Sequence, residues 1–186
     1  MKEIYATLNE VVYDFKEEYE NIEMVVYSLI AFAIPLLFTH PQLLTGTVVN
    51  AFLILAAFKL RGVKILPLVF LPSIAAFLNG FLFGPITYYL IYLMPPIWIG
   101  NFVLVYTFKK LHLSQKINYW LTAGIAAILK ASVIFAGAYL LIQFNIIPAA
   151  LLTAMGIMQL TTAALGAIIA FVLIFLMRFL TSKISG

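Results

Sequence analysis

A lysine near the middle of a long apolar stretch is the feature that most constrains this chain. Lys130 lies within residues 118–142, which are otherwise interrupted only by small or hydroxyl side chains. At about 1.5 Å of rise per residue, a helix of this length crosses a bilayer about 30 Å thick. A lysine so far from both ends cannot reach the interface along its own helix. An ionisable residue in that position is expensive, so Lys130 is a candidate functional residue.

The rest of the sequence offers Lys130 no counter-ion. No aspartate or glutamate follows Glu23 anywhere in the chain. The partner of the lysine is therefore a backbone carbonyl, a neutral polar group, trapped water or an anionic ligand. Alternatively, the lysine is neutral.

The composition is that of a membrane protein, and the sequence lacks the residue patterns of common active sites. The chain is 65% hydrophobic and 10% charged, which predicts several transmembrane helices. Cysteine is absent, and His40 and His112 are far apart in predicted loops, so we expect no metal site. We find no paired carboxylates, no nucleophile elbow and no phosphate-binding glycine loop. The sequence therefore predicts neither an enzyme nor a cofactor.

Charge is distributed very unevenly along the chain. Residues 1–23 hold all seven acidic residues and two lysines, whereas residues 24–186 hold nine basic residues and no acid. Those nine bases gather at the edges of apolar segments, as expected of residues that set membrane topology. The basic composition is thus explained without nucleic acid, which we do not expect as a partner.

The apolar segments predict an all-α bundle of six transmembrane helices. The expected spans are 24–38, 43–60, 63–83, 85–108, 118–142 and 148–177. They define a membrane domain over residues 24–180, preceded by an acidic segment, 1–23, and followed by a short tail, 181–186. With six spans, every basic loop falls on the same side as both termini. The positive-inside rule then places both termini in the cytoplasm of a protein of the cell membrane.

The acidic segment 1–23 predicts an amphipathic surface helix. Apolar residues such as Ile4, Leu8, Val11 and Phe15 recur at helical spacing, with acids between them. Helices on a membrane surface are usually basic, because they meet anionic lipid. An acidic helix suits the basic loops of its own chain or a basic partner, although it can also simply lie in the interface.

Polar residues within the spans are the other site candidates. Asn79, Trp98 and Asn101 lie in the third and fourth spans, and Gln159 and Thr162 share one face of the sixth. Each can instead be structural, through an interhelical hydrogen bond or packing. Gln159 and Thr162 opposite Lys130 would form a polar pocket, so we assign substrate binding to Lys130, Gln159, Asn101, Asn79, Trp98 and Thr162.

Three stretches of sequence carry a family resemblance. They are LNGFLFGP at residues 78–85, PPIWIGN at 95–101 and QLTTAALG at 159–166. Together with six spans in a short chain, they resemble the substrate-binding S component of energy-coupling factor (ECF) transporters, over residues 24–180. One departure is in the first span, where the family often carries two alanines four residues apart and Ala31 is here followed by Pro35.

The resemblance implies a vitamin, vitamin precursor or similar micronutrient as the substrate, bound near the outer face. It also implies a separate transmembrane coupling subunit and two ATPases, because the S component itself hydrolyses nothing. The position of Lys130 indicates, in addition, that the substrate carries an anionic group. Two alternatives stay open. One is a structural membrane protein, similar in size and span count to the rod-shape-determining membrane component. The other is a membrane subunit whose lysine is purely structural.

Overall fold

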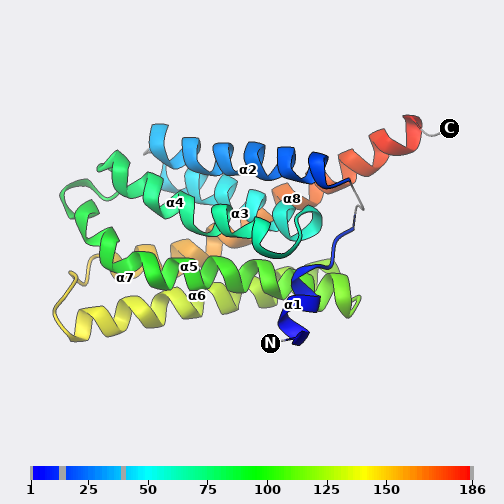
Figure 1. Ribbon diagram of the computed structural model, residues 1–186. Helices are drawn as coiled ribbons and strands as arrows, with labels where there is room; N and C mark the ends of the chain where they lie inside the picture. The colour runs from blue at the N-terminus through cyan, green and yellow to red at the C-terminus, as the bar shows by residue number, and fades with distance from the viewer. Residues whose placement is uncertain (1, 13–15, 39–40, 185–186) are drawn as a thin grey trace.

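A computed structural model describes residues 2–12, 16–38 and 41–184, and in these residues it contains helices and no strand. Figure 1 shows the long helices running side by side in one bundle. The α-helices are α1 (Lys2–Leu8), α2 (Glu17–Leu37), α3 (Gln42–Lys59), α4 (Leu66–Asn79), α5 (Leu90–Thr107), α6 (Tyr119–Gln143), α7 (Leu151–Met155) and α8 (Ile157–Ile184). Short 3-10 helices, η1 (Gly62–Ile65) and η2 (Gly84–Tyr89), precede α4 and α5, and a π-helical turn, η3 (Phe108–Ser114), continues α5.

Six helical segments of the described chain are long and apolar enough to cross a membrane. They are Glu17–Leu37, Gln42–Lys59, Gly62–Asn79, Gly84–Ser114, Tyr119–Gln143 and Leu151–Met177. The prediction of an all-α, six-span membrane bundle is confirmed. Large apolar side chains such as Val25, Leu29 and Phe175 lie on the outside of the bundle, where a bilayer would cover them.

Both ends of the chain differ in their helix bounds from the sequence prediction. The surface helix expected over residues 1–23 is confined to α1, and α2 already begins at Glu17, well before Met24. Residues Glu17–Glu23 therefore extend the first spanning helix instead of the surface helix. At the other end α8 continues to Ile184, so most of the expected tail is helical, and residues 185–186 lie outside the described part. Figure 1 shows α8 projecting beyond the other helices.

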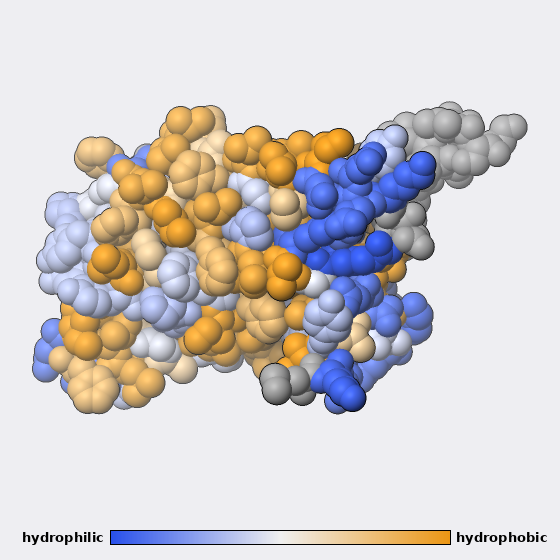
Figure 2. All heavy atoms as spheres, viewed as in Figure 1, coloured by the Kyte–Doolittle hydropathy of each residue, from blue (hydrophilic) through white to orange (hydrophobic). Residues whose placement is uncertain are grey.

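The two ends of the bundle differ sharply in charge. We call the charged end the one formed by α1 with residues 59–64 and 109–116, and the uncharged end the one formed by connections 80–84 and 144–150. In Figure 2 the hydrophilic residues gather at the charged end, whereas the middle of the bundle is mainly hydrophobic. This grouping matches the alternation of basic and uncharged loops that the sequence predicts.

At the charged end, the acidic N-terminal residues contact the chain's own basic loops. Glu3 pairs with Lys110, and Lys64 Nζ lies 3.0 Å from Glu20 Oε2. Further pairs are Glu17 with Lys64, Glu20 with Arg61 and Glu23 with Lys59. These pairs agree with one of the placements considered for the acidic segment, against the protein's own basic loops.

Lys109 fixes the N-terminal segment to the bundle from within. Its side chain is fully buried, and Nζ donates hydrogen bonds to the carbonyl oxygens of Glu10 at 2.6 Å and Leu60 at 2.8 Å. The backbone N–H of Val12 also donates to the carbonyl of Phe58 at 2.9 Å. Lys109 is thus a buried structural group, although the sequence suggested a loop lysine that only sets topology.

Glycines determine how closely the central helices approach. A Cβ built on Gly166 of α8 would lie 2.6 Å from Asn50 Cβ and 2.9 Å from the backbone nitrogen of Ala51 on α3. A Cβ on Gly137 of α6 would lie 2.5 Å from Cβ of Pro96 on α5. Small residues permit such close contact between membrane helices. The pairs α3–α8 and α5–α6 are therefore held together at short range, and each pair contributes to the site described next.

Candidate functional site

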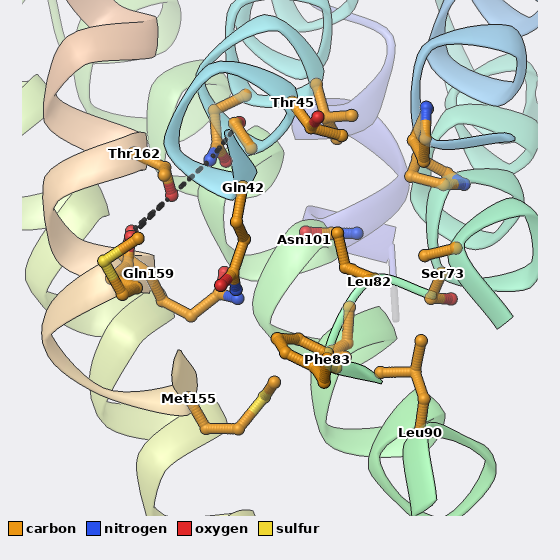
Figure 3. Close-up of a pocket in the computed structure, with 18 of the residues that line it drawn as sticks. Gln42, Thr45, Ser73, Leu82, Phe83, Leu90, Asn101, Met155, Gln159 and Thr162 are labelled. Carbon is orange, nitrogen blue, oxygen red and sulfur yellow. Dashed lines mark hydrogen bonds between the residues drawn. The ribbon is translucent and has the colours of Figure 1, made fainter. Parts of the chain in front are cut away.

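A cavity lies among α3, α4, α5, α6 and α8, near the uncharged end of the bundle (Figure 3). The cavity has a volume of about 90 Å³. This is smaller than most small-molecule sites, which measure roughly 300–1,000 Å³, so it suits a compact ligand. Its polar lining consists of Gln42, Thr45, Asn50, Ser73, Asn101, Lys130, Gln159 and Thr162.

Lys130 is the ionisable member of this lining. The side chain is 2% exposed, and Nζ donates hydrogen bonds to Asn50 Oδ1 at 2.5 Å and to Asn101 Oδ1 at 2.7 Å. Both acceptors are neutral amides, and no carboxylate follows Glu23 in the chain. The site therefore contains a buried amine with neutral partners, which is one of the possibilities that the sequence left open.

The two asparagines are held so that their oxygens face Lys130. Asn50 Nδ2 donates to the carbonyl of Gly46 at 2.9 Å and to Thr162 Oγ1 at 3.2 Å. Asn101 Nδ2 donates to the carbonyl of Val69 at 3.0 Å. These bonds use the amide N–H groups elsewhere, so each side chain presents its acceptor to the lysine.

Helix packing accounts for the position of each polar group. A Cβ on Gly46 would lie 2.8 Å from Thr162 Cγ2, and only a glycine there lets α8 bring Thr162 against Asn50. A Cβ on Gly100 would lie 2.6 Å from Ile134 and 3.3 Å from the carbonyl of Lys130. Close contact of α5 with α6 thus places Asn101, the next residue, beside the lysine.

The cavity is polar at one side and apolar at the other. We call Asn50, Asn101, Lys130 and Thr162 the polar floor, and Leu82, Phe83, Leu90 and Met155 the apolar cover. In Figure 3 the side chains of Phe83, Leu90 and Met155 lie together on the far side of the cavity from Thr45 and Thr162. The side chains of Gln42 and Gln159 extend toward each other between these two layers.

Four of the six predicted site residues come together here. Lys130 and Asn101 are hydrogen-bonded, Thr162 reaches Lys130 through Asn50, and Gln159 lines the cavity. The grouping of Gln159 and Thr162 with Lys130 agrees with the shared face seen in the sequence.

Asn79 and Trp98 do not belong to the described lining. Asn79 Nδ2 donates to the carbonyl of Leu36 at 2.6 Å and Oδ1 accepts from the Phe81 N–H at 3.1 Å, at the end of α4. Trp98 Nε1 donates to Ser73 Oγ at 2.7 Å, and Ser73 lines the cavity. Asn79 is engaged in interhelical bonding, and Trp98 positions a lining residue rather than contributing to the lining itself.

Asn50 is the residue that the sequence reasoning missed. It lies within an otherwise apolar span, and a carboxamide there cannot face lipid cheaply, which is the argument that did single out Asn79 and Asn101. Gln42 and Thr45 were also missed. Gln42 falls just before the second predicted span, 43–60, and Thr45 lies near its start, and only the tertiary structure turns this end of the span toward the cavity.

The site can bind a ligand through one amine and several amide groups. Within residues 2–12, 16–38 and 41–184, no group of three or more histidine, cysteine or acidic side chains is placed to hold a metal ion. Because its protein partners are all neutral, the buried amine of Lys130 can pair with an anionic ligand.

Comparison with models of known protein families, with curated proteins and with solved structures gives no significant match. The fold and the cavity define a class, that of multi-pass helical membrane proteins with a buried polar site. A function for this chain is argued from that site.

Proposed function

We propose that this chain is the membrane-embedded substrate-binding subunit of an uptake transporter of the ECF type, with an anionic, vitamin-like micronutrient as its substrate. The observation that carries the proposal is Lys130, which is buried, faces a cavity and has two neutral amide partners. Desolvation makes an unpaired buried charge costly, and an anionic ligand relieves that cost on binding.

The charge distribution supports an orientation for this subunit. Basic loops favour the cytoplasmic side, so the charged end would face the cytoplasm of a cell membrane and both termini would lie there. The cavity near the uncharged end would then receive its ligand from outside. This is the direction required of an uptake subunit.

Energy for uptake would come from other chains. The sequence holds no phosphate-binding glycine loop, and its membrane spans after Glu23 hold no carboxylate for a proton relay. Concentrative transport would therefore require a transmembrane coupling subunit with two ATPases. Reconstituted by itself, the chain should bind its ligand without accumulating it against a gradient.

A structural membrane protein without a substrate is the second candidate. The observation that favours it is that Asn50 and Asn101 already hold Lys130 with two hydrogen bonds. Under this alternative the lysine would join α3, α5 and α6, and the cavity would hold only water.

Ligand copurification separates the two candidates. The protein would be purified in mild detergent, denatured, and its released small molecules identified by mass spectrometry, in parallel with Lys130→Met. Lys109→Met is the matched control, because Lys109 is equally buried and also holds two oxygen acceptors, yet it lies outside the cavity lining.

We expect an anionic compound to be released by the wild type and by Lys109→Met, and to be lost from Lys130→Met. A stoichiometric ligand retained equally by all three proteins would overturn the role of Lys130. A wild type that carries no small molecule and binds none would overturn the proposed function in favour of the structural candidate.

A further inference from the structure

We infer that the cavity selects a compact monocarboxylate with an apolar body, and rejects phosphate esters and other dianions. This inference rests on the proposed function and names the chemical class of its ligand. It follows from three properties of the lining: the hydrogen bonds already made by the polar floor, its single charge, and the apolar cover.

The polar floor leaves few donors for an anion. Two of the three N–H groups of the Lys130 ammonium are taken by Asn50 and Asn101. Asn50 Nδ2 donates to the carbonyl of Gly46 and to Thr162 Oγ1, and one N–H of Asn101 donates to the carbonyl of Val69. Thr162 Oγ1 donates within its own helix, to the carbonyl of Met158 at 2.8 Å. One N–H of Lys130 and the second N–H of Asn101 therefore remain for the ligand.

A phosphate dianion is poorly matched to this floor. It requires several donors and more than one positive charge, whereas Lys130 is the single charged side chain among the described lining residues. Its additional oxygens would also face Asn50 Oδ1 and Asn101 Oδ1, which crowd the ammonium at 2.5 and 2.7 Å. Like partial charges held this close repel. One negative charge on the ligand balances the positive charge of Lys130, whereas a second negative charge has no counter-charge in the lining.

The second oxygen of a carboxylate has its own donors nearby. Gln42 and Gln159 also line the cavity, and in Figure 3 their side chains extend toward each other between the polar floor and the apolar cover. A carboxylate with one oxygen on Lys130 can direct the other to these amides. An uncharged amide ligand would lose the charge-assisted bond to the lysine, which is the stronger of the two.

The apolar cover defines the remainder of the ligand. Phe83, Leu90 and Met155 bring aromatic, leucine and thioether surface to the side opposite Thr45 and Thr162, and Leu82 adds further apolar lining. Hydroxyl-rich groups placed against these side chains would be desolvated without partners, which is unfavourable. The body of the ligand is accordingly apolar, and short enough to lie between the cover and Lys130.

Three probes that share a body and differ in headgroup test the assignment: 3-phenylpropanoate, 3-phenylpropanamide and 2-phenylethyl phosphate. Apparent dissociation constants would be measured by thermal shift on the detergent-purified full chain, after ligand removal, for the wild type and Lys130→Met. We expect the wild type to bind the carboxylate roughly 30-fold or more tightly than the amide or the phosphate, the low end of the range for truncating a buried charge pair. We expect Lys130→Met to bind carboxylate and amide equally.

Two results of the probe titrations would overturn the inference. One is a phosphate that binds as tightly as the carboxylate, and the other is a carboxylate preference that survives in Lys130→Met. Copurification of an anionic phosphate ester would also overturn it, while leaving the proposed function in place. The absence of both a copurifying ligand and any binding of the three probes would overturn both proposals.

Discussion

The two buried lysines of this protein make a natural comparison, because they have similar partners in very different surroundings. Lys109 at the charged end is fully buried and donates to two backbone carbonyls, those of Glu10 and Leu60. Lys130 in the middle of α6 is 2% exposed and donates to two side-chain amide oxygens. Only the second faces the cavity described above.

The surroundings determine what each lysine contributes. Backbone carbonyls cannot rotate to find a new donor, so Lys109 joins α3 and the N-terminal segment in one arrangement. The amide oxygens that hold Lys130 border the cavity, which has room for water to hydrogen-bond them in place of the lysine. Burial by itself therefore does not distinguish a structural lysine from a binding lysine. The access of the lysine to a cavity does.

The largest expected effect is the loss of ligand binding in Lys130→Met. Methionine keeps the length and apolar stem of the lysine but removes the charge that the ligand would neutralise. Binding of an anionic ligand should weaken by roughly 2–5 kcal/mol, the range for truncating a buried charge pair. Isothermal titration with the copurifying ligand measures it, and Lys109→Met should bind as the wild type does.

The reciprocal change, Lys109→Met, should act on stability. It leaves the buried carbonyl of Leu60 without its donor, at a cost of about 1–3 kcal/mol, and also removes the donor to the carbonyl of Glu10, an exposed residue. Chemical denaturation followed by tryptophan fluorescence would give the free energy of unfolding. If the N-terminal segment contributed nothing to the fold, this variant would unfold at the same denaturant concentration as the wild type.

Close packing behind the polar floor can be tested with Gly166→Ala. The added Cβ would lie 2.6 Å from Asn50 Cβ and 2.9 Å from a backbone nitrogen, so α3 and α8 must separate. We expect a loss of about 1–3 kcal/mol in stability and weaker ligand binding, because Asn50 moves. Gly124→Ala on α6 is the control, since its Cβ meets nothing within 4 Å. Equal stability of the two variants would argue against the close α3–α8 contact.

The smallest effect is expected at the exposed ion pair of the charged end. The hydrogen bond from Lys110 lowers the pKa of Glu3 below its ordinary value of 4.5. A depressed folded-state pKa stabilises the protein above the unfolded value, and the stabilisation is lost as the pH falls through the folded value. Glu3→Gln should therefore change the melting temperature slightly near pH 7 and not at all at acid pH. A large change at both pH values would show that Glu3 acts through packing rather than charge.

One physical argument from the sequence predicted the helices and most of the polar floor. Polar groups in a bilayer must be satisfied, so Lys130, Asn101, Gln159 and Thr162 stood out against their apolar spans. The six spans followed from the length and hydropathy of the apolar segments. The structure confirms them within a few residues, except at the start of α2 and at the end of the fourth span, which continues to Ser114.

The parts that sequence could not supply depend on tertiary contacts. Lys109 was placed at a loop because three bases cluster there, and nothing local indicates that residues 10–12 fold over it. Asn79 carries the same signal as Asn101, yet α4 directs it to the carbonyl of Leu36 instead of the cavity. A one-dimensional pattern identifies a polar side chain that needs a partner, but it does not identify the partner.

The measurement that tests the central claim most directly is the unfolding free energy of the ligand-free proteins, wild type, Lys130→Met and Lys109→Met, under one set of conditions. If Lys130 is a binding group, removing its unpaired charge leaves the empty protein at least as stable as the wild type, while Lys109→Met is destabilised. If Lys130→Met loses as much stability as Lys109→Met, the lysine is structural, and the account of the cavity as an anion site is contradicted.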